Sequence, residues 1–70
     1  MRHPEVTATR RRLAVALERL DLHDAYLAAG QEGKARNELA VAAIALDDAA
    51  QHARNALPAR HASTSQENAA

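Results

Sequence analysis

The sequence predicts an all-α fold, an antiparallel hairpin of two helices, on the strength of three observations. The 70 residues contain 19 alanines and 8 leucines against three valines, one isoleucine and one tyrosine, which favours helix over strand. Apolar residues recur at spacings of three, four and seven on both sides of the middle of the chain. Between these two stretches, Gly30 and Gly33 mark a bend. A chain this short and without cysteine has a small core, so we expect dimerisation, or docking on a partner, to complete a helical bundle.

The first helix is expected over about residues 5–29. It begins near Pro4, whose fixed φ suits a first helical turn, or slightly later with Thr7 or Thr9 as the N-cap. A stripe at seven-residue spacing predicts the main packing surface: Val6, Leu13, Leu20 and Leu27, with Ala16 and Leu17 beside them. A second, smaller apolar strip falls on nearly the opposite side and consists of Val15, Leu22 and Tyr26. One partner helix cannot cover both strips.

The turn is expected at residues 30–34 and the second helix at about 35–57, ending before Pro58. Residues spaced by three and four predict its packing surface: Ala35, Leu39, Ala42, Leu46, Ala49, Ala53, and Leu57 or Ala56. The small side chains on this surface let a facing helix approach at the close end of the usual range of about 8 to 10 Å. Val41 and Ile44 lie off this surface and repeat the two-faced pattern of the first helix.

The hairpin, residues 1–57, is followed by a stretch at 58–70 without large apolar residues, which predicts a disordered tail. Nine basic and nine acidic side chains cancel, which argues against a strongly basic nucleic-acid binder. No apolar run approaches the roughly 18 residues of a membrane span, and the N-terminus lacks the apolar stretch of a signal peptide. We therefore expect a cytoplasmic protein with no membrane contact.

Two patterns invite a chemical interpretation. The stretch GQEGK, residues 30–34, contains two glycines and a lysine, but a phosphate-binding loop needs a preceding strand and a following Ser or Thr. Asp48 and His52 are four residues apart and could share a metal ion, but they project away from the predicted packing surface and no further ligands converge on them. A solvated pair is expected there instead. The sequence thus predicts no catalytic residue, no metal, no cofactor and no small-molecule substrate.

Asp24 falls close to the leucine stripe, between Leu20 and Leu27. A buried carboxylate is costly unless it is paired. Either the stripe drifts so that Asp24 is exposed near the end of the helix, or Asp24 meets an Arg or Lys of a partner. In the second case it would help to determine which partner binds.

Three consecutive arginines, Arg10, Arg11 and Arg12, fan over most of one helical turn. They are either solvated or in contact with nucleic acid or an acidic partner. Arg19 lies seven residues beyond Arg12 and could extend such a basic strip. No aromatic stacking platform accompanies it.

The middle of the chain resembles a single tetratricopeptide unit, with LDD where that repeat usually closes with Asp-Pro. The residues in the family's order and spacing are Leu22, Ala25, Tyr26, Gly30, Ala35, Leu39 and Ala42. His23 and Glu32 depart from the family pattern, the closing proline is absent, and no second copy exists. The resemblance implies a helical hairpin that binds protein. In size and two-helix form the chain is also similar to small co-chaperones of type III secretion needle subunits and, in architecture alone, to RNA-binding hairpin dimers that regulate plasmid copy number.

These observations predict a non-enzymatic protein–protein interaction module, a small adaptor or co-chaperone whose partner is a second copy or a helical protein. Helix packing is assigned to Leu13, Leu17, Leu20, Leu27, Leu39, Leu46 and Leu57. Partner binding is assigned to Val15, Leu22, Tyr26, Val41 and Ile44. The alternative is a dimeric hairpin regulator that binds RNA or DNA through Arg10, Arg11, Arg12 and Arg19.

Overall fold

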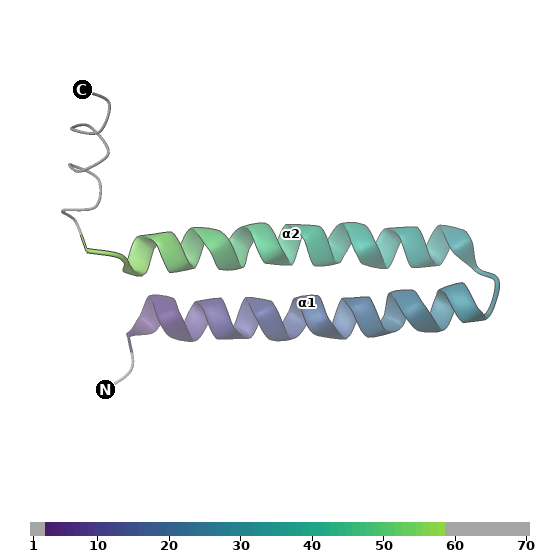
Figure 1. Cartoon of the computed structure of the whole chain (residues 1–70), viewed down its shortest axis with the longest axis horizontal. Coiled ribbons are helices and arrows are strands. Elements are labelled where there is room, and N and C mark those ends of the chain that lie inside the picture. Colours follow the sequence, from purple (N-terminus) through teal and green to yellow (C-terminus); the bar gives the residue numbers. More distant parts are fainter. Residues whose placement is uncertain (1–2, 59–70) are drawn as a thin grey trace, which may run out of the picture.

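Two long helices make up nearly all of the part of the chain that the structure describes, residues 3–58. In this computed structural model, helix α1 spans Pro4–Ala28 and helix α2 spans Glu32–Ala56, and the two run antiparallel, side by side (Figure 1). Each has 25 residues and is therefore about 37 Å long. The predicted all-α hairpin is confirmed. The predicted tail, apart from Pro58, lies outside the described residues.

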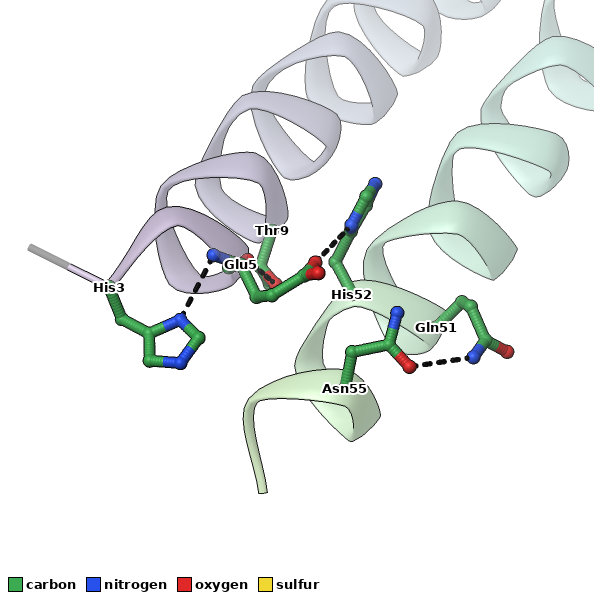
Figure 2. A network of polar contacts seen from close by, with 6 residues as sticks. All are labelled: His3, Glu5, Thr9, Gln51, His52 and Asn55. Atoms are coloured by element: carbon green, nitrogen blue, oxygen red, sulfur yellow. Dashed lines mark hydrogen bonds and ion pairs between the residues drawn. The ribbon is translucent and has the colours of Figure 1, made fainter. Parts of the chain in front are cut away.

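Helix α1 begins at Pro4, the earlier of the predicted starts, and Thr7 and Thr9 lie inside it. The N-cap is His3, whose Nδ1 accepts a hydrogen bond from the backbone N–H of Glu5 at 3.0 Å (Figure 2). This bond satisfies one of the backbone donors that the first turn of a helix leaves unpaired. The carboxylate of Glu5, in the first turn, also suits the positive end of the helix dipole.

The bend between the helices is a tight glycine cap. Gly30 has φ of 77°, in the left-handed region that glycine adopts without steric cost. Its N–H donates to the carbonyl of Leu27 at 3.0 Å, and the N–H of Gln31 donates to the carbonyl of Tyr26 at 2.9 Å. These two bonds are the Schellman pair that satisfies the last carbonyls of a helix. As a result, α2 starts at Glu32, three residues before the predicted 35, and the turn is shorter than the predicted 30–34.

The two glycines make a matched pair for mutation, because Gly30 needs its positive φ whereas Gly33 lies in the first turn of α2. A Cβ added at either position would meet nothing within 4 Å, so any effect comes from the backbone alone. Gly30→Ala is expected to lower the free energy of unfolding by about 1 to 2 kcal/mol. Gly33→Ala is expected to raise it by about 0.5 to 1 kcal/mol. Urea denaturation measures both, and shifts of equal sign would contradict this account of the turn.

The contact between α1 and α2, here called the seam, is lined by alanine on α2 and by mixed side chains on α1. The five fully buried residues of the described chain are all alanines: Ala16, Ala35, Ala42, Ala45 and Ala49. Half-buried polar and aromatic side chains complete the seam at the same alternating spacing of three and four: Glu5, Thr9, Arg19, His23, Tyr26, Glu38 and His52. Such spacing on both helices is that of a coiled-coil pair.

The prediction that the leucines pack α1 against α2 is wrong. In α1 the predicted Val6 and leucines are exposed or, for Leu20, half-buried, and Leu17 is 64% exposed, whereas Ala16, predicted beside them, is buried. In α2 the predicted alanines at 35, 42 and 49 are buried, whereas the predicted leucines at 39, 46 and 57 are exposed. The physical reason is that each of these leucines follows a seam residue by one position. One position along an α-helix is a turn of about 100° around its axis, so the leucines point away from the seam.

The smaller predicted strip is also placed differently. Val15, Leu22 and Tyr26 are predicted on the outer side of α1, but all three are half-buried: Tyr26 is part of the seam, and Val15 and Leu22 lie beside it. Val41 and Ile44 are exposed, as the prediction of an outer contact requires. What they contact stays a prediction.

Candidate interaction surface

Large apolar side chains collect on one side of the hairpin. In α1, Val6, Leu13, Leu20 and Leu27 each follow a residue of the seam stripe by one position, and in α2 the same is true of Leu39 and Leu46. The helices run in opposite directions and lie on opposite sides of the seam, so the same 100° step turns both sets toward one face. Leu17 and Leu57 extend this set further outward on α1 and α2.

We call this surface the leucine face and define it by its large apolar members: Val6, Leu13, Leu17, Leu20, Leu27, Leu39, Leu46 and Leu57. All but the half-buried Leu20 are 36% to 64% exposed. Two helices about 37 Å long and about 10 Å apart present a face of roughly 700 Å². The exposed apolar side chains occupy part of this outline, and an apolar patch of a few hundred Å² is already a sign of an interaction site on a protein. The leucine face is thus the candidate functional site.

Four charged residues lie within the leucine face: Glu32, which is seven residues before Leu39, and three others that are in line with the outer leucines. Arg10 and Asp24 are each seven residues from Leu17, and Arg36 lies on α2. All three are exposed, and the side chain of Asp24 is 79% exposed. The carboxylate of Asp24 contacts Nδ1 of its neighbour His23 at 3.0 Å. Of the two alternatives for Asp24, exposure is therefore what the hairpin shows, and pairing with a partner stays a prediction.

Arg19 is part of the seam. Its Nη1 donates to Oε1 of Glu38 at 3.1 Å, across the hairpin. The hydrogen bond to Glu38, and then the charge of that carboxylate, raise the pKa of the Arg19 guanidinium. The Nε of Arg19 is buried and has no hydrogen-bond partner. Arg19 is thus engaged inside the hairpin, where the carboxylate of Glu38 offsets the positive charge that a phosphate would meet.

A double-mutant cycle on Arg19 and Glu38 is expected to show favourable coupling, because the two charges meet at a partly shielded position. The cycle uses Arg19→Met and Glu38→Gln, with urea denaturation at low and at 1 M salt. Salt screening should weaken the coupling without abolishing it. The control cycle pairs Glu38→Gln with Arg36→Met, at an exposed arginine. Equal coupling in the two cycles would contradict a specific link.

His52 also crosses the seam. Its Nδ1 lies 2.6 Å from Oε1 of Glu5, and Figure 2 shows the two side chains meeting between the ends of the helices. The predicted solvated pair of Asp48 and His52, projecting away from the packing surface, is therefore wrong. The contact instead joins the first turn of α1 to the last turns of α2 and closes the open end of the hairpin.

The three consecutive arginines are all exposed but do not form one strip. Arg10 lies in the leucine face, Arg12 follows the seam spacing, and Arg11 turns toward the opposite side, near Val15. A ligand that touched all three would have to wrap around α1.

Among residues 3–58 there is no pocket and no cluster of three or more side chains able to hold a metal ion. Neither α1 nor α2 combines the length and apolar character needed to cross a membrane. Comparisons of the chain with models of protein families, with curated proteins and with solved structures found no match. The class that the described fold defines is an all-α hairpin with one exposed leucine face.

Proposed function

We propose that this chain is a non-enzymatic protein–protein interaction module, a small adaptor or co-chaperone, that works through the leucine face. One observation carries the proposal: the hairpin buries only alanines completely and leaves most of its leucines exposed. Covering a Leu side chain contributes about 1.5 to 3 kcal/mol, so covering this face gives a partner a large gain. The resemblance to a tetratricopeptide unit supports a role in protein binding, and the proposed compartment is the cytoplasm.

The proposal exchanges the two roles, helix packing and partner binding, that the sequence analysis assigned to the apolar residues. The leucines, expected to join the two helices, become the partner-binding residues. The strip of Val15, Leu22 and Tyr26 supports the hairpin itself. On the side opposite the leucine face, Val41 and Ile44 remain as a smaller exposed patch, and they provide the control surface for an experiment.

The test compares two double variants that place aspartate on different faces. Leu13→Asp with Leu46→Asp alters the leucine face, and Val41→Asp with Ile44→Asp alters the opposite face at similarly exposed positions. Sedimentation over a wide concentration range, with circular dichroism on the same samples, measures assembly and helicity. The wild type should form a complex of defined stoichiometry, with itself or with a purified helical partner, that only the first variant loses. A wild type and two variants that all behave alike would refute the proposal.

The alternative function is a nucleic-acid-binding regulator. The exposure of Arg10, Arg11 and Arg12 favours it, whereas the pairing of Arg19 with Glu38 weakens one of its four predicted contacts. Fluorescence anisotropy with labelled RNA and DNA tests it at several salt concentrations. Binding that falls steeply with salt, and that is lost when the three exposed arginines are changed to glutamine, would establish this function. Absence of binding at low salt would exclude it.

A further inference from the structure

We propose that the leucine face binds a second copy of this chain. In the resulting four-helix bundle, α1 pairs antiparallel with α1 of the second copy, and α2 pairs antiparallel with α2. This inference rests on the proposed function, which requires a partner for the face but does not say which one. It follows from a symmetry in the sequence of the face, because a two-fold interface must be complementary to itself.

On α1 the residues of the leucine face are arranged almost symmetrically about a midpoint next to Leu17. Arg10 and Asp24 stand seven residues on either side of Leu17, and two apolar pairs share a midpoint next to Leu17. The pairs are Val6 with Leu27 and Leu13 with Leu20. When the α1 helices of two copies pair antiparallel about this midpoint, large apolar side chains therefore lie opposite large apolar side chains along the whole helix.

The part on α2 has its own midpoint, between Leu39 and Leu46. Contacts across the seam show which residues of the two helices are level: Glu5 faces His52, Arg19 faces Glu38, and Lys34 Nζ lies 5.7 Å from the ring centre of Tyr26. Interpolation between the first two contacts, which lie on either side of Leu17, places the midpoint of α1 level with about residues 40–41 of α2. One axis, perpendicular to the helices, thus passes within about two residues, or roughly 3 Å, of both midpoints.

Charge fixes the direction of the pairing. With the axis next to Leu17, Arg10 of each copy lies opposite Asp24 of the other, so the interface gains two ion pairs. Both side chains are exposed in the hairpin and can reach across. A parallel pairing of the two α1 helices would instead set Arg10 against Arg10 and Asp24 against Asp24. Opposite charges at an interface rim select register and orientation in this way.

A second two-fold arrangement, with the axis parallel to the helices, places α1 on α2 of the other copy. It pairs Asp24 with Arg36, but no acidic residue of the leucine face is level with Arg10, and Leu27 is level with Glu32. In the proposed arrangement every large residue of α1 meets another large residue. The face of about 700 Å² per copy would bury roughly 1,400 Å² in total, within the usual range of about 1,200 to 2,000 Å² for a stable complex.

Charge reversal tests the proposal on the full chain. Arg10→Asp alone and Asp24→Arg alone each place like charges opposite one another twice, and each is expected to weaken the dimer about tenfold in sedimentation experiments at low salt. Combining the two changes in one chain should restore the dimer to within a few-fold of the wild type. Mixing the two single variants should give a heterodimer, because each supplies the charges that the other lacks. Circular dichroism on every sample shows that the helices persist.

The outcomes separate this inference from the proposed function. Rescue of Asp24→Arg by Arg36→Asp, and not by Arg10→Asp, would overturn the pairing of α1 with α1. A wild-type chain that stays monomeric and helical at all concentrations, yet binds a purified helical partner through the leucine face, would overturn the second copy as occupant while the function stands. If substitutions in the leucine face alter no interaction at all, both proposals fail.

Discussion

Replacing Ala42 by leucine is expected to lower the free energy of unfolding by about 1 to 3 kcal/mol, the usual cost of forcing extra methylene groups into a packed site. Ala42 is 1% exposed and lies in the middle of the seam, among alanines on the same helix. Small side chains let the helices approach closely, so the larger residue has no space to enter. It must push the helices apart or distort its neighbours.

The matched control is Ala40→Leu, two residues away on the exposed side of α2. Both substitutions exchange alanine for leucine inside the same helix, so their difference isolates the effect of the seam. The control should change stability by less than about 0.5 kcal/mol. Urea denaturation of the two variants gives the comparison. If Ala42→Leu were as stable as Ala40→Leu, the alanines would not form the contact between the helices.

The temperature of unfolding is expected to depend strongly on protein concentration, because the proposed dimer dissociates when the chain unfolds. Two copies contribute four helices of 25 residues each. At about 0.7 kcal/mol per residue the unfolding enthalpy of the dimer is about 70 kcal/mol, so each tenfold dilution should lower the midpoint by about 7 °C. Thermal scans followed by circular dichroism over a hundredfold range of concentration measure this slope.

The variant with Leu13→Asp and Leu46→Asp provides the control for the thermal scans. It is expected to unfold at a lower temperature than the wild type and at the same temperature across all dilutions. A wild-type midpoint that does not move over the hundredfold range would mean that the hairpin is stable as a single copy. The dimer would then make no contribution to its folding.

The helices were predictable because their signals are local. Pro4 begins the first helix, Gly30 ends it, and the second stops before Pro58. The shorter turn was not predicted, because Gly33 was assigned to the bend although it lies in the first turn of α2. The side chain of His3 as N-cap was also missed, since histidine is not among the residues usually preferred there.

The contact between the helices could not be chosen from hydrophobicity alone. Each helix carries more than one stripe at seven-residue spacing. The stripe richest in leucine was predicted to be internal in α1, and a surface that combines alanines with leucines was predicted to be internal in α2. In α1 the internal stripe instead contains Arg19 and His23, which read as solvent-facing in isolation. Their contribution to packing can be recognised only when α2 lies opposite them, because Glu38 accepts the hydrogen bond of Arg19 and the small alanines leave space for long side chains. Such a choice depends on pairs of residues far apart in the sequence.

Tyr26 is the single aromatic residue of the chain, and it lies beside the bend with the ammonium of Lys34 over its ring. Tyrosine fluorescence and near-ultraviolet circular dichroism therefore report only on the closed end of the hairpin. The far-ultraviolet signal, in contrast, averages over the full length of both helices. Following the two signals together during unfolding distinguishes fraying from the open end, where Glu5 meets His52, from separation of the helices at the turn. The protein thus carries a built-in optical probe whose location is known.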